Sequence, residues 1–203
     1  MDKKALRLLA LGLVVCVGAA FAATAKAGLG LNLGAASCGP TAPVFSPWGD
    51  QHQYFLAPNG GFEAGSSGWN LSGGAHVVSG NEPFYIHSKQ DSSSLYLPDG
   101  GVADLPSVCF GSNTPGIRFL AMSPAGSATV HVRIIAHGLL GVLAILDGGT
   151  YRVGPSWAPT VNFGTTFSQL NSTLLGAKSI EIVLSASGPV QLDDVYLDPF
   201  TQY

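Results

Sequence analysis

Apolar and polar residues alternate with a period of two along much of the chain, and turn residues interrupt the alternation at short intervals. In the first half, the alternation predicts short strands at residues 75–79, 83–87, 94–97, 107–110 and 116–121. Turn residues separate them, as in the Pro-Asp-Gly-Gly run that ends at Gly101. No long segment has the period of an amphipathic helix. The pattern therefore predicts an all-β protein.

The second half is more regular. Residues 128–136 predict a strand with His131, Arg133 and Ile135 on one face and valine or isoleucine on the other. Residues 139–146 are almost all apolar, which predicts a strand buried on both faces, followed by a turn at residues 147–149. A short helical turn is expected within 167–175, and a last pair of strands at 179–186 and 190–197. Eight or nine strands with turn-rich connections indicate a sandwich or jelly roll.

The stretch from Phe45 to Gly74 is expected to organise the fold. Its Asn59-Gly60-Gly61 run supplies residues that tolerate a positive φ, so the chain can turn there and direct Phe62 inward. Phe62 and Trp69 are expected in the core, and Trp48 in the core or packed against a turn.

The first 27 residues have the features of a cleaved signal peptide. A basic start precedes an apolar run, and Ala25-Lys26-Ala27 fits the small-x-small cleavage rule. A membrane anchor is the alternative, but the apolar run is short for a span and a cleavage site follows it. Cys16 follows Val15 rather than a small residue, which argues against a lipoprotein. We expect secretion with cleavage near Ala27, an extended arm over 28–44, and one domain over 45–203.

The mature chain is acidic and contains two cysteines. It keeps five Lys/Arg and eleven Asp/Glu, a formal charge of −6 before histidines. It lacks the basic clusters of a nucleic-acid binder. In an exported protein, Cys38 and Cys109 are expected to form one disulfide, worth about 2–4 kcal/mol.

Two groups of residues resemble a known family. Asn59-Gly-Gly-Phe-Glu63 with Trp69, and residues 191–197 (QLDDVYL), resemble the first and last strands of carbohydrate-binding-module jelly rolls of the galactose-binding-like superfamily. The mature chain also resembles small secreted proteins of high-GC Gram-positive bacteria, mostly without assigned function. The matching pieces there include residues 45–50 (FSPWGD), 79–84 (SGNEPF) and 193–200 (DDVYLDPF). The resemblance implies a single-domain jelly-roll β-sandwich.

The resemblance also implies a structural calcium ion. In such modules the Glu after Gly-Phe and the first Asp of the last strand often help to hold it, which here means Glu63 and Asp193. Calcium prefers several hard oxygen ligands. The alternative is that both carboxylates cap turns or accept backbone hydrogen bonds. Asp194 is expected on the opposite face of a regular strand from Asp193, so that the two do not share one ion.

A sugar site needs exposed aromatic rings beside polar groups. Trp157 is the leading candidate because it lies in a proline-broken segment near Tyr151 and Arg152, with Tyr85, Tyr96 and Trp48 as further candidates. A core role is the alternative for these aromatic residues. The recognised catalytic motifs G-x-S-x-G, H-E-x-x-H and the P-loop do not occur in the sequence. Glu181 and Asp193 could be imagined as the carboxylate pair of a glycosidase, but a structural role is favoured for both.

We therefore expect a non-catalytic, secreted β-sandwich that binds a carbohydrate or a cell-envelope glycan. The alternative from another class is a surface or matrix structural protein that acts through protein contacts and has no small ligand. A hydrolase is the third and weakest hypothesis. No membrane span is expected in the mature chain.

Overall fold

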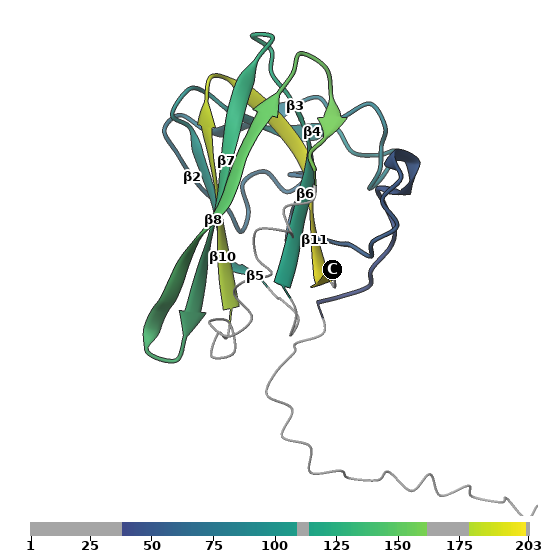
Figure 1. Cartoon of the computed structure of the whole chain (residues 1–203). Coiled ribbons are helices and arrows are strands. Elements are labelled where there is room, and N and C mark those ends of the chain that lie inside the picture. Colours follow the sequence, from purple (N-terminus) through teal and green to yellow (C-terminus); the bar gives the residue numbers. More distant parts are fainter. Residues whose placement is uncertain (1–37, 109–113, 162–178, 202–203) are drawn as a thin grey trace, which may run out of the picture. The chain divides into compact units, whose positions relative to one another are not determined.

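The computed structural model describes residues 38–108, 114–161 and 179–201 of the chain. These residues form an antiparallel sandwich of two β-sheets, as Figure 1 shows. The all-β prediction is confirmed. In the part of the chain that the structure describes, no helix has the length and apolar character needed to cross a bilayer.

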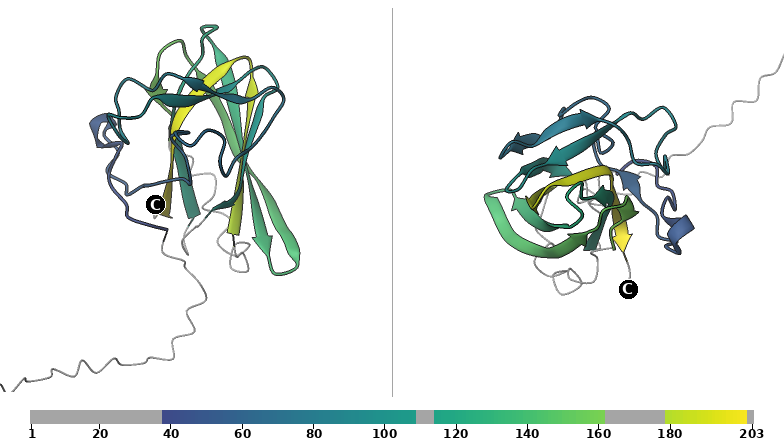
Figure 2. Two further views of the ribbon diagram at one scale, coloured as in Figure 1. Left: turned by 180° about the vertical axis from the view of Figure 1, so that it is seen from behind. Right: turned by 90° about the horizontal axis from the view of Figure 1, so that it is seen from above.

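One sheet has six strands, in the spatial order β3-β4-β11-β6-β9 with β1 paired to β11. Its strands are β1 (Phe55–Leu56), β3 (His76–Ser79), β4 (Ser93–Leu97), β6 (Thr114–Met122), β9 (Ala158–Pro159) and β11 (Val190–Thr201). The other sheet has five strands, in the order β2-β5-β10-β7-β8. Its strands are β2 (Asn70–Ser72), β5 (Val102–Val108), β7 (Ala128–Gly138), β8 (Gly141–Val153) and β10 (Ser179–Ser187). Figure 2 shows the two layers from behind and from above.

The main core lies between the sheets and follows the predicted alternation. In β7, Val130, Val132 and Ile134 are buried, whereas the side chains between them face outward. Phe62 and Trp69 are buried as expected, and their rings pack 5.2 Å apart between centroids. Trp69 also donates its indole N–H to the carbonyl of Pro58 at 3.0 Å, which satisfies the one polar group of the ring.

A second, smaller core covers the outer face of the six-stranded sheet. Phe45, Tyr54 and Tyr196 are buried there, and Phe45 meets the other two rings edge-on at 5.0 and 5.7 Å. The segment that carries Phe45 continues into a 3₁₀ turn, Ser46–Trp48. An isolated bridge between Ala42 and Tyr54 closes this segment against the sheet.

A buried ion pair anchors this segment. The guanidinium of Arg118 in β6 bonds to the carboxylate of Asp50 and lies 4.6 Å from the Phe45 ring centroid. Asp50 also accepts hydrogen bonds from the Tyr54 hydroxyl (2.7 Å) and the His52 backbone N–H (3.0 Å). Burial alone would raise the pKa of Asp50, but these hydrogen bonds and the charge of Arg118 lower it. The predicted motif at residues 45–50 is thus a structural clasp.

Two elements predicted in the second half of the chain are wrong. Residues 139–146 are not buried on both faces: the chain turns at residues 139–140, and Leu139, Leu140, Val142, Leu143 and Ile145 are all exposed. Among the described residues, β8 pairs only with β7 and is an edge strand, and the hairpin projects beyond its neighbours in Figures 1 and 2. An apolar run does not reveal whether a partner sheet covers it.

The turn expected at residues 147–149 is the other error. Strand β8 continues through it, with a register shift that leaves Gly148 unpaired opposite β7. An ideal Cβ on Gly148 would lie 2.8 Å from the Val132 carbonyl oxygen, so glycine permits a bulge there without ending the strand.

Several expectations concern residues outside the described ranges. The signal peptide, most of the N-terminal arm, Cys109 and the helical turn at 167–175 all lie outside them. The cleavage site, the domain bounds and the Cys38–Cys109 disulfide therefore stay predictions.

We predict that Asp50→Ala lowers the free energy of unfolding by about 3 kcal/mol, because it leaves the buried Arg118 charge without its partner. Urea denaturation of the mature chain measures the loss. Asp147→Ala is the matched control, because the Asp147 side chain is 76% exposed although it bonds to His131. It should lose less than about 1 kcal/mol. Equal losses in the two variants would contradict the clasp.

Candidate functional site

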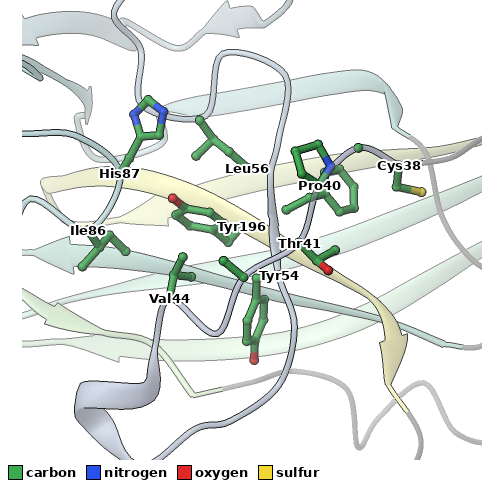
Figure 3. A pocket seen from close by; sticks show the side chains of 12 residues that line it. Cys38, Pro40, Thr41, Val44, Tyr54, Leu56, Ile86, His87 and Tyr196 are labelled. Atoms are coloured by element: carbon green, nitrogen blue, oxygen red, sulfur yellow. The ribbon is translucent and has the colours of Figure 1, made fainter.

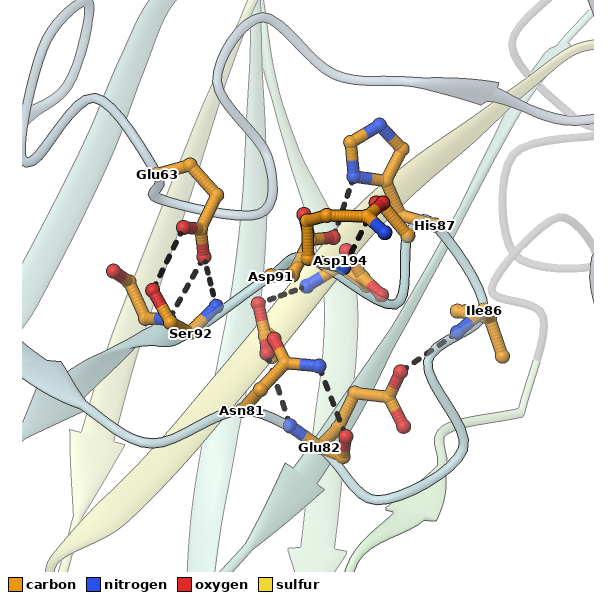
Figure 4. Close-up of polar contacts among 12 residues, drawn as sticks. Glu63, Asn81, Glu82, Ile86, His87, Asp91, Ser92 and Asp194 are labelled. Carbon is orange, nitrogen blue, oxygen red and sulfur yellow. Dashed lines mark hydrogen bonds and ion pairs between the residues drawn. The ribbon is translucent and has the colours of Figure 1, made fainter.

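Three segments meet at one end of the six-stranded sheet. They are the turn at Asn59–Glu63, the connection between β3 and β4, and a short irregular stretch of β11. Backbone hydrogen bonds tie the first to the third, from Ala57 N–H to the Val195 carbonyl (2.9 Å) and from Val195 N–H to the Gly60 carbonyl (3.0 Å). Figure 4 shows their side chains converging.

The irregular stretch of β11 buries two adjacent carboxylates. The pairing of β11 with β6 shifts register between Asp193 and Tyr196, and Asp194 adopts a left-handed φ of 51°. Asp193 and Asp194 are both fully buried. The strand is not regular at this position, but the group of potential metal ligands that contains Asp194 does not include Asp193. The expectation that the two aspartates do not share one ion therefore stays a prediction.

Left-handed residues gather around this point. In the described chain the non-glycine residues with positive φ are Asn59, Phe62, Tyr85 and Asp194, and they occupy the three converging segments. Such conformations cost about 1–3 kcal/mol each and persist only where surrounding contacts impose them. Asn59 illustrates the compensation, since its side-chain amide donates to the carbonyls of Gly65 (2.8 Å) and Ser67 (3.0 Å).

The two glycines of the turn serve close approach rather than a positive φ. An ideal Cβ on Gly60 would lie 2.6 Å from the Val195 carbonyl oxygen, so any side chain would push β11 away. An ideal Cβ on Gly61 would lie 3.1 Å from Asp194 Oδ1. The sequence prediction was right that this run forms the turn. Only Asn59, however, has the positive φ expected of the run.

The two predicted calcium ligands each accept backbone hydrogen bonds. Glu63 is exposed, and its Oε1 accepts from the N–H groups of Ser92 (2.8 Å) and Ser93 (2.7 Å) at the start of β4. Asp193 Oδ2 accepts from the N–H of Glu82 (3.2 Å), and its Oδ1 from that of Asp194 (2.8 Å). This matches the alternative role given to both residues. Calcium ligation by Glu63 and Asp193 stays a prediction.

Glu82 shapes the loop that follows β3. Its side chain is fully buried, and its carboxylate accepts the backbone N–H of Phe84 and that of Ile86, the latter at 2.8 Å. These bonds hold residues 83–87 as a tight turn, so the strand predicted there is wrong. Proline at position 83 and the polar run at 88–94 are signals that favour a loop.

His87, Asp91 and Asp194 form a group with the spacing of metal ligands. One ligand atom from each lies within 4.8 Å of the others. His87 Nδ1 and Asp91 Oδ2 are 2.6 Å apart, whereas neither carboxylate oxygen of Asp194 accepts a hydrogen bond of good geometry. A buried carboxylate without partners is rare and points to a missing counter-charge. The group therefore fits a cation.

The buried carboxyls have raised pKa values. Burial, and next the charge of Asp194, raises the pKa of Asp193 to about 8. Burial, and next the charge of Glu82, raises the pKa of Asp194 to about 7, although the ring and the nearby backbone N–H of His87 act in the opposite direction. Both shifts have the same physical origin, because each carboxyl is buried and lies beside other acidic groups.

The predicted sugar-binding residues do not form one site. Tyr151 and Arg152 line a pocket of about 210 Å³ beside β9, and neither Trp157 nor Tyr85 contributes to its lining. Trp157 is half-buried in the connection between β8 and β9. Tyr85 lies on the Glu82 loop and is 47% exposed, and its neighbour Phe84 is 46% exposed. Phe84 meets Trp48 edge-on with centroids 5.0 Å apart. The sequence analysis did not select Phe84.

A larger pocket of about 540 Å³ lies beside the cation group. Figure 3 shows Ile86 and His87 at one end and Cys38 at the other, with Tyr54 and Tyr196 between them. Burial raises the pKa of both tyrosines, so their hydroxyls stay protonated. This pocket joins the second core to the His87 loop.

Comparisons with known proteins give only distant similarities. No protein-family model and no curated protein matches the chain. The xylan-binding domain CBM22-1 of Paenibacillus barcinonensis Xyn10C is 15% identical, covers 75% of this chain and 97% of its own, and has a TM-score of 0.49. The C-terminal family 22 carbohydrate-binding module of Clostridium thermocellum Xyn10B is 14% identical, with 73% and 96% covered and a TM-score of 0.45.

A third similar structure is an enzyme. The enzymatically active domain of tailspike protein 4 of bacteriophage CBA120 is 14% identical, covers 70% of this chain and 21% of its own, and has a TM-score of 0.49. Similarity at this level carries no information on ligand or activity. What the chain binds has to be argued from its own side chains.

We predict that the metal-free protein loses stability as the pH rises. Asp193 and Asp194 bind protons more tightly in the folded chain than in the unfolded chain, so their stabilisation is complete below about pH 4 and is lost through about pH 7 to 8. In chelator, the free energy of unfolding should be lower at pH 8.5 than at pH 5.5 by an amount on the order of 2–4 kcal/mol. Denaturant titrations at both pH values measure it.

Asp194→Asn should remove much of this dependence, because one of the two raised carboxyls no longer titrates. Asp147→Asn is the control, since the pKa of that exposed carboxyl is lowered and it titrates outside the window. A flat pH profile of the unsubstituted protein would be the contrary result.

Proposed function

We propose that the mature chain is a secreted, non-catalytic β-sandwich of the galactose-binding-like jelly-roll type that binds a neutral carbohydrate or cell-envelope glycan. The observation that carries the proposal is the aromatic pair Phe84 and Tyr85. Their rings are about half exposed on adjacent residues of one loop. Pyranose rings have apolar faces, and exposed aromatic side chains bind such faces well.

The loop that presents this pair is fixed before any ligand arrives. The buried Glu82 carboxylate bonds to two backbone N–H groups of the loop, and Tyr85 is held at φ 53°. Trp48 supports the Phe84 ring from the side. A preorganised platform loses little conformational entropy when a ligand binds, which favours affinity from a small contact area.

The charge of the chain narrows the class of polymer. With five basic and eleven acidic residues after removal of the signal peptide, the mature chain repels polyanions. Arg118 is moreover engaged in the buried clasp. Neutral polysaccharides are therefore the favoured ligands, ahead of phosphate-rich envelope polymers.

The predicted site around Trp157 is the second location for a glycan within the same proposal. Arg152 is exposed there and Tyr151 is half-buried at the small pocket. The calcium ion at Glu63 and Asp193 and the Cys38–Cys109 disulfide also remain parts of the proposal. Secretion rests on the N-terminal sequence alone.

One observation favours a different function, that of a structural protein acting through protein contacts. Five aliphatic side chains are exposed on the β7–β8 hairpin, from 46% for Leu143 to 103% for Leu140. Exposed apolar patches of this kind mark interaction surfaces. Loss of self-association on substitution of the hairpin, without any retention on glycans, would favour this alternative.

We predict that the oxidised mature chain is retarded in affinity electrophoresis through gels that contain neutral polysaccharides. Tyr85→Asn should abolish the retardation, because it removes the ring while asparagine tolerates the left-handed φ. Trp157→Ala serves as the comparison and should leave the retardation unchanged.

The reverse pattern, with loss only in Trp157→Ala, would move the site to the β8–β9 connection. If none of the three proteins is retarded by any polysaccharide, although all three unfold at the same temperature, the proposed function is overturned.

A further inference from the structure

We infer that His87, Asp91 and Asp194 bind a divalent transition ion of the zinc class, which ties the loop after Glu82 to the last strand. This site goes beyond the proposed function, and it stands or falls without any glycan. It also differs in ligands and in ion from the calcium site that the sequence resemblance implies at Glu63 and Asp193.

Asp194 has no hydrogen-bond donor of good geometry among the described residues. Both of its carboxylate oxygens are buried, and no N–H or O–H group of the described residues donates to them with good geometry. Its acidic neighbours Glu82, Asp91 and Asp193 add negative charge instead of removing it. A buried, unpaired carboxylate is strongly unfavourable, and a cation relieves both the burial and the repulsion.

The three ligand atoms also border a common space. Gly61 faces the group, and an ideal Cβ there would lie 3.1 Å from Asp194 Oδ1, 3.7 Å from His87 Nδ1 and 3.9 Å from Asp91 Oδ2. All three ligand atoms thus border the space that the absent side chain leaves. The His87 side chain is exposed, whereas those of Asp91 and Asp194 are buried, so an ion would reach the group from the His87 side, where a water ligand has access.

The ligand chemistry selects the ion. Calcium takes six to eight oxygen ligands, and an imidazole nitrogen is a poor substitute for one of them. Zinc takes imidazole and carboxylate ligands in a four-coordinate arrangement, and three protein ligands with one water fill such a site. His87 Nδ1 and Asp91 Oδ2, now 2.6 Å apart, share a hydrogen. Metal binding requires the neutral imidazole tautomer with its hydrogen on Nε2, which leaves Nδ1 and the Asp91 carboxylate free to bond to the metal.

The ion would also restrain the loop that carries the exposed aromatic pair, Phe84 and Tyr85. Phe84 and Tyr85 lie between Glu82, which fixes the start of the loop, and His87, which the metal would fix to β11. The metal therefore limits the motion of the loop from its second end. This effect is separate from contact with a ligand, because none of the metal ligands belongs to the exposed aromatic pair.

The test uses the oxidised mature chain, freed of metal by chelator and then dialysed at pH 7.5. Thermal unfolding is recorded with zinc, calcium or magnesium chloride, and cobalt chloride serves as a spectroscopic substitute under native conditions. Zinc at a hundredfold excess over Kd should raise Tm by about 5–10 °C, with smaller shifts for calcium and magnesium. Cobalt should give visible absorption that saturates at one ion per chain.

The variants separate this group from adventitious binding. His87→Gln should lose the zinc shift and the cobalt spectrum. His131→Gln is the matched control, because His131 forms a comparable 2.8 Å contact with Asp147 on the other sheet but belongs to no such three-residue group among the described residues. It should bind zinc as the unsubstituted chain does.

Asp194→Asn is the decisive variant, because it is expected to fold stably, so a loss of zinc binding cannot be attributed to misfolding. Without metal it should raise Tm at pH 8, because the unpaired buried charge is gone, and with zinc it should show no further shift. Three results would overturn the inference: full zinc binding in His87→Gln, a larger shift with calcium than with zinc, or no shift with any ion. Retention on glycans is measured separately, so its failure leaves this result untouched.

Discussion

Two adjacent carboxylates buried in the last strand are the constraint on which the surrounding loops depend. A regular strand would direct Asp193 and Asp194 to opposite faces. Here β11 shifts register against β6, Asp194 has a left-handed φ, and both side chains are fully buried. Each neighbouring segment then meets a fixed set of acceptors. The N–H of Glu82 satisfies Asp193, and the glycines after Asn59 give the chain room to pass close to β11.

The strained backbone conformations of the described chain gather around these two carboxylates. A left-handed aspartate, a left-handed tyrosine and a left-handed pair in the Asn59 turn lie in three segments that meet at one place. None of these conformations is favourable alone. Hydrogen bonds within the segment accompany them in the Asn59 turn and in the loop after Glu82. The region behaves as a unit because the bonds of Glu82 and Glu63 both terminate on backbone N–H groups of the β3–β4 connection and of β4. Removal of one of the acidic groups would change the pKa values of Asp193 and Asp194, because neighbouring charges contribute to both.

The sequence predicts an element well where the local pattern of apolar and polar residues is enough to define its buried face. Residues 128–136 alternate because one face of β7 meets the core, and this is visible in the letters alone. The apolar run at 139–146 reads like a buried strand, but only the order of strands reveals that β8 lies at an edge. The loop at 83–87 escapes prediction for a similar reason: its shape comes from hydrogen bonds to Glu82 that no periodicity encodes.

Part of the candidate site could be recognised from the sequence, and part only from the folded structure. Glu63 and the two aspartates stand out in the sequence, but His87 and Asp91 gain their meaning only when the β3–β4 connection folds over β11.

The exposed edge of β8 has a consequence for chains that gather on a surface. In the described structure its thirteen residues pair on one side only. Residues 141–146 carry no charge that would keep a second strand away, and the charged residues of β8, Asp147 and Arg152, follow later in the strand. A polymer with many repeating units holds bound chains at a high local concentration. Under that crowding, edge meets edge far more often than in dilute solution. If the proposed glycan binding holds, a coat of such chains would gain cohesion from backbone pairing between β8 edges, which an isolated chain would not reveal.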